Sequence, residues 1–266
     1  MFRSRLSLLV IAASLLMVRA GAAQTISSSV TFDGSIPPFG YSQSAGLLIV
    51  DGSGAPVLTL TNSATTSGIQ DIYIGSTSGN TGGIAAYGGS SLVTNGVAIL
   101  GFNAGSTGSI TIAGTSGSGT ASQWTGASQL YLGYNGAGYL TITGGGQVTS
   151  ASTILGEFTN STGVVTVAGT SVGGTASAWN LGANNLLLGN AASSSGTLTV
   201  TGGGQVNAGA ISIATNATST GALTISGPGS TFTVASGFGH GLWVSGTSIG
   251  SGGTGSLTVN NGGSLV

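Results

Sequence analysis

The chain has almost no charged side chains. Only 3% of its 266 residues are Asp, Glu, Lys or Arg, against about a quarter in ordinary soluble domains. The charged residues are Arg3, Arg5, Arg19, Asp33, Asp51, Asp71 and Glu157. No Lys or Arg follows position 19, and without cationic side chains we expect no nucleic-acid partner, because such surfaces must neutralise phosphates.

Other absences narrow the class of protein further. Cysteine is missing, so there is no disulfide framework and no thiolate metal site. Four prolines without a Gly-X-Y period exclude collagen. No long run has the 3.6-residue period of an amphipathic helix. Glycine is abundant instead, with 52 copies, about one residue in five against a usual one in fourteen.

The first 23 residues have the organisation of an export signal. Arg3 and Arg5 form a positive start, and an apolar stretch covers 6–18. This stretch is too short to span a bilayer, which needs about 20 residues. Small residues then lead to a cleavage site after Ala23 or the residue before it. The sequence therefore predicts a signal peptide at 1–23 and export by the Sec machinery.

The rest of the chain is built from an internal repeat. The segment 138–148 (GYLTITGGGQV) recurs 58 residues later at 196–206 (GTLTVTGGGQV). Its first part, Gly-x-apolar-Thr-apolar, also begins at Gly108, Gly163, Gly221 and Gly255. Each copy follows a short apolar strand, the last of which we expect at 248–250. The chain thus contains about eight units, two in each 58-residue period.

The unit has the pattern of half-buried β-strands. Leu140 and Ile142 alternate with Thr141 and Thr143, the period-2 pattern of a strand with one buried face. With about three short strands, each unit forms one coil of a β-solenoid whose coils stack at ~4.8 Å. Apolar residues point inward, Thr, Ser and Asn line the outside, and glycine recurs at the coil corners. A disordered Gly/Ser-rich linker would not keep this register across six copies.

Three motifs follow one another in the best-defined unit: LYLG at 130–133, GYLTI at 138–142 and GGGQV at 144–148. Over residues 70–266 the units resemble the passenger-associated repeat of autotransporters (type V secretion) and of some PEP-CTERM surface proteins. The resemblance implies an all-β, right-handed parallel β-helix. It also implies a protein displayed on, or released from, the outer membrane of a Gram-negative cell.

The predicted organisation has three parts. They are the signal peptide at 1–23, an N-terminal cap with the first coil at 24–70, and the passenger-associated repeats at 71–266. Passengers of this kind are followed by an outer-membrane β-barrel translocator, and no run of ten-residue amphipathic strands with aromatic girdles occurs in this sequence. We therefore expect the repeat region to be truncated, and the translocator to lie downstream of Val266 or in a separate chain.

Few residues could carry catalysis. Glycoside hydrolysis needs two carboxylates about 5–10 Å apart, and Asp33, Asp51 and Asp71 are spaced by less than one coil, so we expect them in separate turns. Glu157 is expected in a turn, in contact with solvent. His240 has no acidic residue within 80 positions, so a Ser–His–acid site is not expected. The sequence predicts no catalytic, cofactor-binding or metal-binding residue.

Two other patterns are candidates for binding. Trp124, Trp179 and Phe232 occupy related places in alternate coils; they could form an exposed ladder for sugars, but an interior stack is favoured. Thr-x-Thr pairs at 141–143 and 199–201 are of the type that ice-binding solenoids use, although only two of six coils carry the pair.

These features predict a non-enzymatic, exported surface rod that acts as a stalk or adhesin, with a host or matrix glycan as its possible ligand. Two alternatives stay open. One is an extracellular polysaccharide-active β-helix enzyme, and the other is a binder of ice or crystal surfaces.

Overall fold

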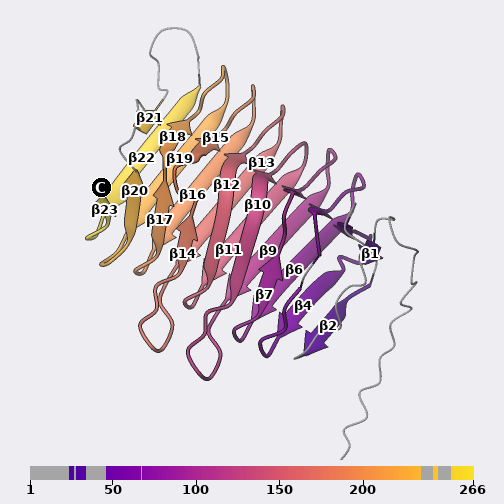
Figure 1. The fold of residues 1–266 in the computed structure, drawn as a ribbon. Coiled ribbons are helices and arrows are strands. Elements are labelled where there is room, and N and C mark those ends of the chain that lie inside the picture. The colour runs from indigo at the N-terminus through magenta and orange to yellow at the C-terminus, as the bar shows by residue number, and fades with distance from the viewer. Residues whose placement is uncertain (1–23, 27, 34–45, 67, 235–241, 245–252) are drawn as a thin grey trace, which may run out of the picture.

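The computed structural model describes residues 24–26, 28–33, 46–66, 68–234, 242–244 and 253–266. The regular structure within them is entirely β-strand, in two long parallel sheets that run side by side along one axis (Figure 1). The predicted parallel β-helix is confirmed. The predicted signal peptide at 1–23, His240 and the expected strand at 248–250 lie outside the described residues.

One face of the rod is a nine-stranded sheet in which each strand pairs in parallel with its equivalent in the next coil. Its strands are β2 (Val30–Asp33), β4 (Val57–Thr61), β6 (Thr81–Tyr87), β9 (Thr107–Ala113), β11 (Ala137–Thr143), β13 (Thr162–Ala168), β16 (Ser195–Thr201), β19 (Thr220–Ser226) and β22 (Thr254–Asn260). Gly138 pairs with Gly108 and Gly163, so the repeated sequence motifs align residue for residue.

The other sheet has 14 strands and divides into two stacks. The A1 stack contains β7 (Ser91–Val93), the first halves of β10 (Gln123–Leu132) and β12 (Gln147–Leu155), β14 (Ala178–Asn180), β17 (Gln205–Ala208), β20 (Thr231–Val234) and β23 (Ser264–Leu265). The A2 stack contains β1 (Gln24–Ile26), β3 (Leu47–Val50), β5 (Asp71–Ile74), β8 (Val97–Leu100), the second halves of β10 and β12, β15 (Asn185–Leu188), β18 (Ala210–Ile213) and β21 (Leu242–Val244).

Each complete coil therefore contributes one strand position to the nine-stranded sheet, one to A1 and one to A2, as predicted. The nine-stranded sheet passes through one coil more than the eight expected. β21 pairs with β18 and so occupies the place in A2 that the sequence assigned to 248–250.

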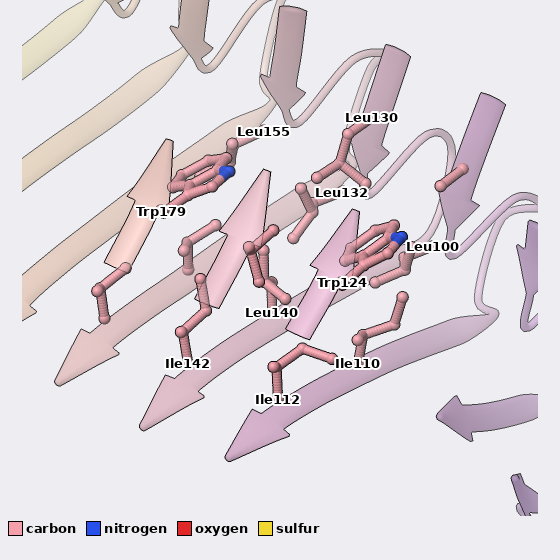
Figure 2. Close-up of a cluster of buried hydrophobic side chains, with 14 of the residues drawn as sticks. Leu100, Ile110, Ile112, Trp124, Leu130, Leu132, Leu140, Ile142, Leu155 and Trp179 are labelled. Atoms are coloured by element: carbon pink, nitrogen blue, oxygen red, sulfur yellow. The ribbon is translucent and has the colours of Figure 1, made fainter. Parts of the chain in front are cut away.

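The core is a set of in-register columns of buried side chains. Leu140 and Ile142 are fully buried on β11 and lie beside Ile110 and Ile112 on β9 (Figure 2). The threonines between them point outward, so the predicted inside-outside alternation is confirmed. Each buried Leu or Ile contributes about 1.5–3 kcal/mol relative to its exposed state, and neighbouring coils supply the cover.

The A1 stack places bulky and small side chains alternately along the axis. Trp124 pairs with Val148, Val148 with Trp179, Trp179 with Val206, and Val206 with Phe232. All three aromatic residues are completely buried, as favoured from the sequence. They do not stack on one another, however, because a valine separates each from the next.

Each buried indole has a hydrogen-bond acceptor in the preceding coil. Trp124 Nε1 donates to Thr94 Oγ1 at 3.1 Å, and Trp179 Nε1 donates to Ser150 Oγ at 3.0 Å. The third aromatic side chain, a phenylalanine, has no polar atom, and Ala208 holds the equivalent place before it. The hydroxyl is present where an indole N–H must be satisfied, because a buried unpaired donor costs about 1–3 kcal/mol.

Glycine is favoured where A2 turns into the nine-stranded sheet. Gly133 has φ +71°, and a Cβ there would lie 2.1 Å from the carbonyl oxygen of Thr162 in the next coil. Gly75, Gly101, Gly156 and Gly189 share this corner and its positive φ. In the next coil Ala214 adopts the same conformation, with φ 57°.

We predict that Gly133→Ala destabilises the rod by about 3 kcal/mol, because a left-handed backbone disfavours Ala and the new Cβ overlaps a neighbouring backbone. The measurement is the urea midpoint followed by circular dichroism. Gly117→Ala is the control, because Gly117 has nothing within 4 Å of the added Cβ. Equal midpoints for the two variants would contradict this account of the corner.

Candidate functional surfaces

The acidic residues near the N-terminus do not form a catalytic pair. Asp71 pairs with Leu47 across A2, whereas Asp51 follows Val50 at the other end of β3, so the two lie ~13 Å apart along the strand direction. This exceeds the separation that glycoside hydrolysis uses. Asp33 is in the nine-stranded sheet. The expectation that these residues occupy turns is wrong for Asp33 and Asp71, which end and begin strands.

Asp51 joins two neighbouring coils. Its buried carboxylate accepts hydrogen bonds from the backbone N–H of Ser76 at 3.1 Å, from Thr77 Oγ1 at 2.5 Å and from Asn80 Nδ2 at 3.3 Å. Burial raises the pKa of Asp51, but the hydrogen bonds outweigh this effect and hold the pKa below its ordinary value. The folded structure therefore favours the ionised form of Asp51 over the protonated form more than water does.

Two more carboxylates make contacts of the same kind. Asp71 Oδ1 accepts from the backbone N–H of Val97 at 2.7 Å, and Glu157 Oε2 accepts from Asn190 Nδ2 at 2.9 Å. Burial raises the pKa of Glu157, and the hydrogen bond from Asn190 offsets only part of that rise. The prediction of a solvated Glu157 is therefore wrong, because its side chain is half-buried and paired with the next coil.

The described part of the chain shows no other concentration of reactive groups. It contains no cluster of three or more His, Cys, Asp or Glu side chains able to hold a metal ion. Every buried side-chain nitrogen or oxygen within it has a hydrogen-bond partner. Nor does any helix there reach the length and apolar character needed to cross a membrane.

Five aromatic side chains form a cluster on the outside of the rod that the sequence analysis missed. We call this cluster the aromatic ridge. Tyr73 stacks on Phe102 with ring centroids 5.3 Å apart, and Phe102 stacks on Tyr134 at 5.4 Å. Tyr131 and Phe158 meet Tyr134 edge to face at 5.2 and 4.6 Å. One available signal was the aromatic residue that directly follows the corner glycine in two successive coils, at 102 and 134.

A second outer feature is a threonine column along the middle of the nine-stranded sheet. The column occupies eight of nine strands, with Ala85 as the gap, and consists of Thr31, Thr59, Thr111, Thr141, Thr166, Thr199, Thr224 and Thr258. Tyr87 and Tyr139 project from the same face and are 41% and 40% exposed.

The pKa of Glu157 is raised and that of Asp51 is lowered. Substituting each carboxylate by its amide should therefore change the stability at pH 7 in opposite directions. For Glu157, whose folded pKa is raised, the unfolded chain ionises first as pH rises, so stability falls between the ordinary and the raised pKa. Glu157→Gln cannot ionise and should have the higher thermal midpoint at pH 7, with no difference near pH 3. The midpoints are measured by calorimetry across this range.

Asp51→Asn provides the matched comparison. The folded pKa of Asp51 is lowered, so its contribution is present above the ordinary pKa and is lost as pH falls through the folded pKa. This variant should be less stable than the wild type at pH 7 and should approach it in acid. If both variants were more stable than the wild type at pH 7, or both less stable, the directions given for the two pKa shifts would be contradicted.

Comparison with known proteins adds no relative, since no protein family, curated protein or solved structure matches the chain.

Proposed function

We propose that the chain is an exported, non-enzymatic β-helix passenger, displayed on or released from a Gram-negative cell surface as a stalk or adhesin. The main support for a non-enzymatic role is that three of the carboxylates of the chain are engaged in contacts between coils. Asp51, Asp71 and Glu157 each accept hydrogen bonds from the following coil, so the groups that hydrolysis would need hold the rod together instead.

Export is supported by the N-terminal sequence. Arg3 and Arg5, followed by the short apolar stretch at 6–18 and small residues up to 23, have the order of a cleavable signal. The proposal includes the Sec machinery, an outer-membrane β-barrel translocator and a host or matrix glycan as partners. A long, weakly charged rod whose outer surface carries many hydroxyl and amide groups beside the aromatic ridge suits display at a surface.

The test of export follows a C-terminally tagged full-length chain by cell fractionation and protease treatment of intact cells. We expect the tag at the cell surface or in the culture supernatant. The control lacks residues 2–23 and should stay in the cytoplasm. Cytoplasmic retention of the intact chain would refute the proposal, and polysaccharide cleavage that Asp51→Asn or Asp71→Asn abolishes would favour the enzyme instead.

One observation favours a second function, binding to ice or another crystal surface. The threonine column presents a hydroxyl and a methyl group in each of eight strands, at the ~4.8 Å spacing of the coils, and β4, β11 and β16 each carry a Thr-x-Thr pair. The threonine column is therefore more regular than the two Thr-x-Thr pairs counted in the sequence suggested. The two projecting tyrosines of the same face interrupt its N-terminal half.

If this surface binds ice, the purified chain should show thermal hysteresis, and Thr199→Tyr should remove most of it, because a large side chain prevents flat contact. Thr149→Tyr serves as the control, since Thr149 points outward from A1 instead. A freezing point equal to the melting point for the wild type would dismiss this second function.

A further inference from the structure

One carboxylate of the rod lies against the aromatic ridge. Tyr134 and Glu157 directly follow the corner glycines of successive coils, so they are neighbours in one column along the axis. Phe158, the residue after Glu157, donates its backbone N–H to the Tyr134 carbonyl at 3.0 Å. Burial, and then the negative charge of Glu157, raise the pKa of Tyr131. The carboxylate is therefore close to three of the five rings.

The charge of Glu157 has no basic partner in the exported part of the chain. Residues 24–266 contain four acidic side chains and no Lys or Arg, which gives a net charge of −4. Asn190 Nδ2 donates to Glu157 Oε2, but this amide is neutral, and a carboxylate offers about four acceptor sites. Charges that are partly withdrawn from water usually have a partner of opposite charge. Glu157 therefore has an uncompensated negative charge beside an apolar surface.

The three rings near this carboxylate stand at steep angles to one another. The plane of Tyr134 makes an angle of 86° with Tyr131 and of 73° with Phe158. Aromatic side chains in such an arrangement form the walls of the cages that bind quaternary ammonium groups, because a cation is attracted to the electron-rich face of a ring. Phe158 is 41% exposed, so a ligand in solution can reach the cluster.

We propose that these three rings and the Glu157 carboxylate bind a quaternary ammonium group of the kind that choline carries. The carboxylate supplies the opposite charge, and the rings contact the methyl groups. The net charge of −4 on residues 24–266 also attracts a cation from solution.

The neighbouring hydrogen-bond acceptors favour a methylated cation over a primary ammonium or a guanidinium. Asn135 donates to the Phe102 carbonyl, and Thr215 Oγ1 donates to the Asn190 carbonyl at 3.2 Å. A lysine ammonium has three N–H donors and an arginine guanidinium has five, and buried donors need acceptors. A trimethylammonium group has no such donors, so the apolar rings and a single carboxylate are sufficient for it.

Two other ligands are disfavoured by the same surface. Sugars pack on ring faces, but the faces between Tyr73, Phe102 and Tyr134 are covered by one another, with interplanar angles of 9° and 10°. A choline esterified to phosphate brings an anion, and residues 24–266 have no Lys or Arg to neutralise it. We therefore expect the free alcohol to bind more tightly than its phosphate ester.

The test is a calorimetric titration of the purified full chain with choline chloride. We expect a dissociation constant on the order of 1 mM, because the site is partly exposed and each cation–π contact there is weak. The neutral analogue of choline, in which carbon replaces the nitrogen, has the same shape and should bind about tenfold more weakly or not at all. Phosphocholine distinguishes the free alcohol from its phosphate ester, and it should also bind more weakly.

Variants locate the site. Phe158→Leu removes a ring but keeps an apolar side chain, and it should weaken choline binding about fivefold, whereas Phe158→Tyr should retain binding. Tyr139→Leu is the matched control, because Tyr139 is 40% exposed but lies on the nine-stranded sheet. If Phe158→Leu fails to fold, Glu157→Gln replaces it, since glutamine can still accept the hydrogen bond from Asn190 and removes only the charge.

Three results would overturn the proposal. They are no choline binding by the wild type up to about 10 mM, equal binding of choline and its neutral analogue, and equal effects of the Phe158→Leu and Tyr139→Leu variants. The titration does not depend on export, so its failure leaves the proposed surface role standing.

Discussion

Parallel, in-register hydrogen bonding between coils is the constraint on which the rest of the structure depends. A single coil cannot bury Leu140 and Ile142, because the atoms that cover them belong to the coils before and after. Once the register is fixed, every sequence position becomes part of a column that runs along the rod. The chemistry of each surface is therefore the chemistry of one repeated position.

The same constraint accounts for the scarcity of charge. A charged residue repeated at an outward position would place like charges ~4.8 Å apart in every coil, and each such pair costs about 1 kcal/mol in water and several times more near the protein. Neutral Thr, Ser and Asn avoid this cost. Asp51, Asp71 and Glu157 occur singly, and each meets donors rather than another carboxylate in the next coil.

Sequence reasoning succeeds here where one coil repeats the pattern of another. The alternation at 140–143, the corner glycines and the interior position of Trp124 and Trp179 follow from periodicity and strand geometry alone. The aromatic ridge does not follow, because its rings come from a strand position in some coils and from the corner in others. Only the folded coils bring Tyr131 against Tyr134, and Tyr134 against Phe158.

The carboxylates show the same limit. The sequence indicates that Asp51 follows a strand, but its burial depends on three donors contributed by the coil after it. Likewise, Glu157 in isolation has the character of a turn residue, and the partner that holds it in place is 33 positions further on. Contacts of this kind have no local signature.

The alternation of Trp124, Val148, Trp179, Val206 and Phe232 has a consequence for how such a rod changes length. Loss or gain of one coil would bring two aromatic rings, or two valines, into direct register, and would overfill or empty the core there. Loss or gain of two coils preserves the alternation and each indole's hydroxyl partner. The unit that can be duplicated or deleted without disturbing the core is then the pair of coils. This pair is the 58-residue repeat that the sequence displays.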